Sequence, residues 1–97
     1  SFAKSSSKNK IVILGDMFEL GEYAAQEHQK IADLATQLKL NTIVLVGNEF
    51  SKTQTSDYII KFSNSEETKI WFQQQHFSGS EILLKGSRSM QMEKVVE

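Results

Sequence analysis

Residues 11–21 read IVILGDMFELG, four large aliphatic residues followed by a glycine and an acidic turn. An uninterrupted aliphatic run of this length predicts a strand that is buried on both faces, as in a parallel sheet. A similar run, Thr42–Val46, also ends at a glycine. Between the two runs, apolar or small residues recur every three or four positions and predict a helix over residues 24–39. We expect Asn41 to end this helix in the left-handed conformation.

The second half of the chain continues the alternation of strands and helices. Residues 48–56 predict only a short helix or an irregular crossover, and Tyr58–Phe62 predict a third strand. Glu81–Lys85 predict a fourth strand that ends at Gly86. Ser89 is expected to cap a last helix with three apolar positions, Met92, Val95 and Val96.

A helix is expected between the third and fourth strands. Ser63 and Glu66 have the spacing of a capping box, in which each side chain accepts a hydrogen bond from the other residue's free N–H group. The helix is predicted to run to about His76, with Trp71 and Phe72 facing the core.

The alternation predicts an α/β fold, with a mostly parallel sheet of about four strands between helices on both faces. Right-handed crossovers favour the strand order 3-2-1-4. Ligands bind such sheets at the carboxyl ends of the strands where the order reverses, here between the first and fourth strands. The turns at residues 15–21 and 85–89 are therefore predicted to meet on one rim.

Composition excludes several classes of protein. The 97 residues suffice for one domain, and 11 Lys and Arg against 12 Asp and Glu argue against nucleic-acid binding through bulk charge. No apolar run is long enough to span a membrane, and no signal peptide is visible. Cysteine is absent, which excludes disulfides and weakly favours a reducing compartment, and two histidines are too few for a His-rich zinc site.

The first nine residues are polar and of low complexity. They are expected to be the end of a helix or linker from an upstream part, with the domain itself over residues 10–97. Since the sequence also lacks an initiator Met, we interpret it as a piece of a longer protein.

Charged residues occupy both predicted turns. Asp16 directly follows a buried strand, where binding and catalytic residues usually lie, while Glu19 and Glu22 could simply cap the next helix. Lys85 and Arg88 flank the start of the last helix and could bind a carboxylate or a phosphate. An alternative, compatible with ligand binding, is an internal ion pair between Arg88 and Asp16.

No complete catalytic motif accompanies these charges. A P-loop is absent, and Gly15 and Gly21 are too far apart for a dinucleotide fingerprint. A receiver domain would need an aspartate after the third strand, where this chain has Ser63-Asn64. His28 lies on the apolar helix face and is interpreted as a core residue rather than a catalyst. Met17, Met90 and Met92 are interpreted as adaptable packing residues. The residues alone thus predict an anion-binding cleft that lacks catalytic groups of its own.

Two motifs and one histidine carry a family resemblance. The segments Val12–Glu22 and Leu84–Lys94, together with His28, resemble the C-terminal domain of the Mur ligases. The resemblance covers nearly all of residues 10–97, although residues 48–75 match only in their alternation of elements. Ala24 stands where the family usually has a small polar helix cap, so the first helix is expected to start less firmly.

The resemblance implies a Rossmann-like domain of an ATP-dependent amide ligase in bacterial peptidoglycan synthesis. Such an enzyme uses ATP and Mg²⁺ to form an acyl phosphate on a UDP-N-acetylmuramoyl tripeptide, which the amine of D-alanyl-D-alanine then attacks. It would be a cytoplasmic monomer that serves cell-wall formation, cell shape and division. Its P-loop and metal ligands would lie in a separate central domain, so this fragment alone is expected to be inactive.

The resemblance also implies site residues. Asp16 falls in the family's Gly-Asp-Met turn, and Ser87 and Arg88 are expected to help hold the dipeptide carboxylate or a phosphate oxygen. Asp16 would orient Arg88 or its turn, and Gly86 would permit close backbone approach. The predicted cleft residues are Asp16, Lys85, Gly86, Ser87 and Arg88, with Gly15, Glu19 and His28 in support and no catalytic or metal-binding residue.

Two other interpretations remain open at the level of sequence. One is a free-standing α/β binding or interaction module without catalysis. The other is a nucleotide-binding domain of a different enzyme, against which the missing glycine fingerprint counts.

Overall fold

A computed structural model describes residues 9–97 and shows a four-stranded, all-parallel sheet. The strands are β1 (Lys10–Gly15), β2 (Thr42–Val46), β3 (Ile60–Phe62) and β4 (Glu81–Lys85). Their order is β3-β2-β1-β4, which confirms the predicted fold class and strand order. Residues 1–8 of the expected upstream linker lie outside the described residues.

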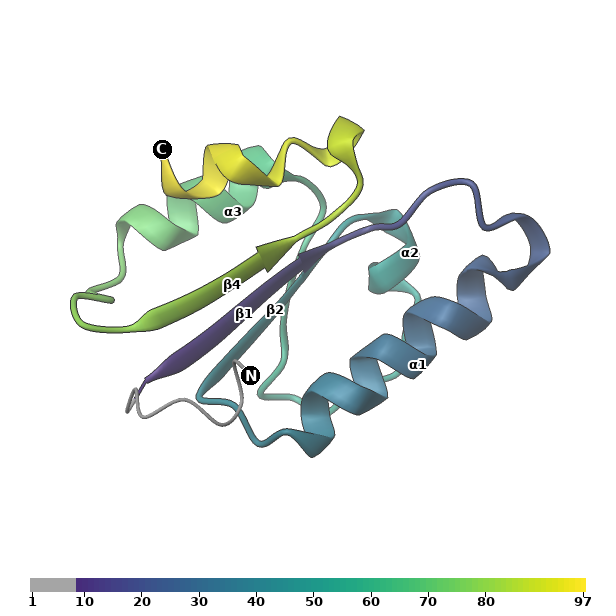
Figure 1. The fold of residues 1–97 in the computed structure, drawn as a ribbon, viewed down its shortest axis with the longest axis horizontal. Coiled ribbons are helices and arrows are strands. Elements are labelled where there is room, and N and C mark those ends of the chain that lie inside the picture. Colours follow the sequence, from purple (N-terminus) through teal and green to yellow (C-terminus); the bar gives the residue numbers. More distant parts are fainter. Residues whose placement is uncertain (1–8) are drawn as a thin grey trace.

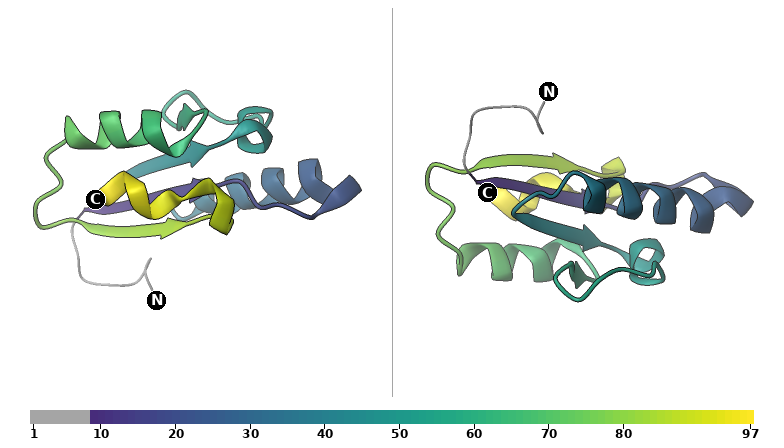
Figure 2. Two further views of the ribbon diagram at one scale, coloured as in Figure 1. Left: turned by 90° about the horizontal axis from the view of Figure 1, so that it is seen from above. Right: turned by 90° about the horizontal axis from the view of Figure 1, so that it is seen from below.

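Helices cover both faces of the sheet (Figures 1 and 2). Helices α1 (Ala24–Gln37) and α2 (Asn48–Ser51) lie on one face. Helix α3 (Ser65–Gln73) and the 3₁₀ helix η4 (Met92–Val96) pack side by side on the other. None of the helices within residues 9–97 is long and apolar enough to cross a membrane.

Alternate residues of β1 supply two separate cores, because successive strand side chains point to opposite faces. Val12 packs toward α1, whereas Ile11 and Ile13 pack toward α3 and η4. The buried core on the α1 side comprises Val12, Ala32, Ala35, Leu40, Ile43, Leu45, Phe50 and Ile59. On the other side it comprises Ile11, Ile13, Val44, Val46, Met92 and Val95, with Trp71 and Phe72 partly buried against it as expected.

The third strand is shorter than predicted. A backbone hydrogen bond from Ile59 N to Ser56 O closes a turn that carries Tyr58 to the surface. Only Ile60–Phe62 then pair with β2. The short helix and irregular crossover expected before this strand are present as α2 and the residues after it.

Both ends of α1 differ in detail from the prediction. A 3₁₀ turn, η2 (Gly21–Tyr23), leads into the helix, and no side chain caps either element. Lys39, not Asn41, adopts the left-handed conformation after the helix, with φ of 53°. The Asn41 side chain instead accepts a hydrogen bond from Lys10 N at the start of β1.

The predicted capping box is displaced by one residue. Asn64 is the N-cap of α3, and its Oδ1 accepts a hydrogen bond from Glu67 N at 2.9 Å. The Glu67 carboxylate in turn accepts from Ser63 N at 3.0 Å. The prediction that Ser63 and Glu66 form the capping box was therefore wrong. Helix α3 ends at Gln73, three residues before the predicted end at His76.

The expected last helix is divided into two 3₁₀ segments. η3 (Arg88–Met90) and η4 are separated by Gln91, whose φ of 53° is left-handed and breaks the helical hydrogen-bond pattern. Ser89 lies inside η3 and does not cap it.

Replacement of Asn64 by Ala is expected to lower the free energy of unfolding by about 1 kcal/mol, because the first turn of α3 loses its cap. The matched control is Ser63→Ala, since no hydrogen bond of that exposed hydroxyl is seen among the described residues. Urea denaturation of both variants measures the difference. Equal destabilisation by the two changes would contradict the assignment of the cap.

Candidate functional site

The two turns predicted to meet are hydrogen-bonded to each other at the carboxyl ends of β1 and β4. Ser87 N donates to Asp16 O at 3.0 Å, and Phe18 N donates to Ser87 Oγ at 2.8 Å. Just before them, Leu14 and Lys85 are paired in the strand register. The prediction that the acidic and basic turns are neighbours on one rim is confirmed.

Asp16 is buried and its carboxylate binds the backbone of α2. Oδ2 accepts from Glu49 N at 2.8 Å, and Oδ1 accepts from Phe50 N at 3.0 Å. Asp16 is only 2% exposed. No ion pair joins it to Arg88 within residues 9–97, so the alternative of an Asp16–Arg88 pair was wrong. The carboxylate orients the turn rather than the guanidinium.

Gly47 makes this contact possible. Its φ is 122°, and a Cβ atom there would overlap the carboxyl group of Asp16. A side chain at position 47 would therefore be strained and would displace the carboxylate. The sequence showed this glycine only as the end of a strand.

His28 fixes the next residue of the turn from inside the core. Its Nε2 accepts a hydrogen bond from Met17 N at 3.0 Å, so the proton lies on Nδ1, which donates to Ala24 O at 2.6 Å. The ring is fully buried and makes an edge contact with Phe50, with centroids 4.7 Å apart. Asp16 Oδ1 lies 3.8 Å from Nε2, too far for a hydrogen bond. The structure agrees with the interpretation of His28 as a satisfied core residue.

The basic residues of the second turn are exposed. The ion pairs of residues 9–97 include neither Lys85 nor Arg88. Arg88 lines a recess of about 480 Å³, which we call the Arg88 recess, with Phe18, Glu19, Ser87 and Ser89. Glu19, like Glu22, is exposed and caps no helix.

Two glycines bring the turns close to each other above one methionine. A Cβ atom at either Gly15 or Gly86 would lie 2.7 Å from the Met92 side chain, and one at Gly86 would also lie 3.1 Å from Gly15 Cα. The close approach expected at Gly86 is therefore an approach to the neighbouring strand. Met92 is buried beneath both turns, in agreement with its interpretation as a packing residue.

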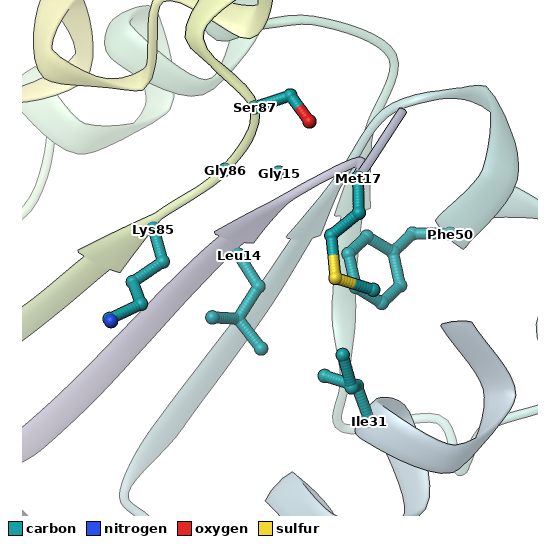
Figure 3. Close-up of a pocket in the computed structure, with 8 residues that line it drawn as sticks. All are labelled: Leu14, Gly15, Met17, Ile31, Phe50, Lys85, Gly86 and Ser87. Carbon is teal, nitrogen blue, oxygen red and sulfur yellow. The ribbon is translucent and has the colours of Figure 1, made fainter. Parts of the chain in front are cut away.

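A second hollow opens on the α1 side of the same rim (Figure 3). This space of about 380 Å³, called here the apolar pocket, has Leu14, Met17, Ile31 and Phe50 as its walls. Lys85, Ser87 and the two glycines complete it. Sequence reasoning missed this pocket, because Leu14 and Ile31 were interpreted only as parts of a buried strand and an apolar helix face, and Phe50 was assigned no role.

We looked for side chains that could bind a metal ion among the residues that the structure describes. Residues 9–97 contain no group of three or more His, Cys, Asp or Glu side chains placed to hold a metal ion.

Comparisons with known proteins show that the chain is similar, over most of its length, to a part of several ligases. A UDP-N-acetylmuramoyl-tripeptide–D-alanyl-D-alanine ligase of Buchnera aphidicola is 36% identical over 91 residues, which are 91% of this chain and 20% of that protein. The ligase of the same name from Treponema pallidum is 28% identical over 100 residues, covering 96% of this chain and 22% of that protein. The resemblance to the Mur ligases is confirmed.

A solved structure agrees in fold with this Mur ligase-like domain. The MurF ligase of Thermotoga maritima in complex with ADP superposes with a TM-score of 0.68 at 24% identity, over 91% of this chain and 21% of that one. No family model matches the sequence. The chain thus spans about a fifth of the length of the relatives that it matches.

Replacement of Asp16 by Asn is expected to lower the free energy of unfolding by about 2 kcal/mol. The amide offers one acceptor oxygen to two buried N–H groups, and its NH₂ group would face the other donor. Asp57→Asn, at an exposed turn, is the matched control. Denaturant unfolding measures both variants, and a loss no larger than that of the control would show that the contact is unimportant.

Proposed function

We propose that the chain is the C-terminal domain of an ATP-dependent ligase that adds D-alanyl-D-alanine to a UDP-N-acetylmuramoyl tripeptide. The similarity to ligases of that name over nine-tenths of the chain supports this proposal. The single structural observation behind it is the rim itself. Hydrogen bonds between the two turns hold Ser87 and Arg88 at the carboxyl ends of parallel strands. Neither Lys85 nor Arg88 forms an ion pair among residues 9–97.

Each rim residue has a role within this proposal. Arg88 and Lys85 supply positive charge for a carboxylate or a phosphate oxygen. Ser87 Oγ accepts from Phe18 N and can still donate its own proton to a ligand. Asp16 binds the start of α2, and His28 binds Met17 N, so these two buried side chains position the turn without touching a ligand.

The catalytic groups are proposed to lie in the rest of the protein. The chain has no P-loop and its described part has no metal-binding cluster, so ATP phosphates and Mg²⁺ are assigned mainly to a central domain. Closure of this domain on the central one would bring the rim to the acyl phosphate and the incoming amine. The ligase would act in the cytoplasm as a monomer and serve cell-wall synthesis, cell shape and division.

Replacement of Arg88 by Ala in the full-length protein is expected to lower kcat/KM for ligation by about tenfold or more, because a charge-assisted bond to substrate is lost. A phosphate-release assay with varied D-alanyl-D-alanine and ATP measures the change. Lys30→Ala removes an exposed cation on α1 that lines neither the Arg88 recess nor the apolar pocket, and is the control.

Unchanged turnover and KM values in the Arg88 variant would remove its proposed role. A reading frame that begins near Ser1, rather than continuing upstream into a P-loop domain, would favour a non-catalytic binding module instead.

A further inference from the structure

The turn after β1 is held by hydrogen bonds from two consecutive backbone N–H groups. Met17 N donates to His28 Nε2 at 3.0 Å. Phe18 N donates to Ser87 Oγ at 2.8 Å and so ties this turn to the one after β4. Glu19, the next residue, has a left-handed φ of 66°, a conformation that residues other than glycine keep only where their surroundings fix it. The shape of the turn therefore depends on both acceptors.

His28 can accept from Met17 only while its Nε2 carries no proton. The single proton of the neutral ring is on Nδ1, which donates to Ala24 O at 2.6 Å. A second proton can therefore add only at Nε2, where it would point at the N–H group of Met17. Two donors that face each other at 3.0 Å repel, so protonation turns this hydrogen bond into an unfavourable contact.

Asp16 offers the protonated ring another partner. Its Oδ1 lies 3.8 Å from His28 Nε2, on a carboxylate that already accepts from Glu49 N and Phe50 N. An ionised carboxylate has about four acceptor positions, so it has room for a further donor. A movement of about 1 Å between the ring and the carboxylate would give a charge-assisted hydrogen bond. Both protonation states of His28 thus have a partner within the same buried cluster.

No other acidic group competes with Asp16 for the ring. Among residues 9–97, it is the one acidic residue that lies within ion-pair distance of His28. On α2, the ring meets the uncharged edge of Phe50. The other charged side chains of the surrounding elements are Glu22, which is exposed, Glu27 and Glu49, which pair with Lys30 and Lys52, and Lys85, which is exposed beside the apolar pocket.

We infer that His28 is a proton-operated switch for the turn after β1. The neutral ring holds Met17 N, whereas the protonated ring binds Asp16, releases Met17 and loosens the contact between Phe18 and Ser87. This inference goes beyond the proposed function, because it requires the contacts of the turn and no particular substrate.

The direction of the pH dependence follows from these contacts. Imidazole is the side chain that changes its charge between about pH 5 and 8. The hydrogen bond to Met17 needs the neutral ring, so it is present at the upper end of this range and is lost as the pH falls. Because Asp16 receives the protonated ring, the turn changes its conformation while the rest of the domain stays folded.

The test uses the full-length protein with isotope-labelled methionine, in which the amide of Met17 reports on its own hydrogen bond. Its NMR signal is assigned by its absence in Met17→Leu. Between about pH 8 and 5.5, the amide proton of Met17 is expected to move upfield as the hydrogen bond to His28 is lost. The dispersion of the other methionine signals shows whether the protein stays folded.

His28→Gln separates the switch from other titrations. Glutamine can place its Oε1 near the position of Nε2 and accept from Met17 N, but it takes up no proton in this pH range. The variant is expected to abolish the movement of the Met17 signal. His76→Gln replaces the other histidine of the chain, which is exposed, and is the matched control with a wild-type response.

A kinetic measurement connects the switch to the rim. The kcat/KM for ligation at about pH 5.5 is divided by that of the same enzyme at about pH 8, so the amount of active enzyme cancels. This quotient is expected to be about fivefold smaller in wild type and in His76→Gln than in His28→Gln, since only the last keeps an acceptor for Met17 N at the lower pH.

Each contrary outcome identifies what fails. A Met17 signal that does not move with pH, or that moves equally in His28→Gln, overturns the inference. Cooperative unfolding of the wild-type protein before the signal moves also overturns it, because Asp16 would then not receive the ring. Equal kinetic quotients in all three enzymes overturn the connection to the rim. A protein without ligase activity overturns the proposed function, whereas the Met17 signal still decides the switch.

Discussion

The rim depends on one buried carboxylate. Asp16 has almost no contact with solvent, and an ionised carboxylate in such a place is costly unless hydrogen bonds compensate for lost water. Two backbone N–H groups at the start of α2 supply that compensation. Because Gly47 has no side chain, the strand–helix corner can approach closely enough to make both bonds. The turn after β1, the position of α2 and the wall at Phe50 all follow from this contact.

The sheet places the turn that Asp16 holds beside the turn that follows β4. Parallel pairing aligns the carboxyl ends of β1 and β4, so turns about seventy residues apart in sequence become hydrogen-bonded neighbours. Charges that stabilise the fold are buried, as at Asp16, whereas Lys85 and Arg88 remain at the surface. This separation leaves the exposed cations available to a ligand without weakening the core.

The strand order and the meeting of the two turns could be predicted, because aliphatic runs and right-handed crossovers leave few alternatives. The hydrogen-bond partners of Asp16 could not be predicted, since no sequence pattern indicates that a carboxylate will bind the N–H groups of a four-residue helix. The cap of α3 was predicted one residue too early, because Ser63 and Asn64 each precede a glutamate by the three residues that a capping box requires. Left-handed residues such as Lys39 and Gln91 carry no compositional signal, so the helix ends and the division of the last helix were missed.

One methionine has a mechanical consequence for the rim. The side chain of Met92 lies directly beneath Gly15 and Gly86, and neither strand end could sink lower or carry a side chain without striking it. Its thioether therefore acts as a spacer whose thickness sets the height of both turns above the sheet. A shorter residue would let the two turns sink together, and oxidation of the sulfur would raise them by adding an oxygen atom beneath them. The height of both turns above the sheet is thus set from underneath, by one buried side chain.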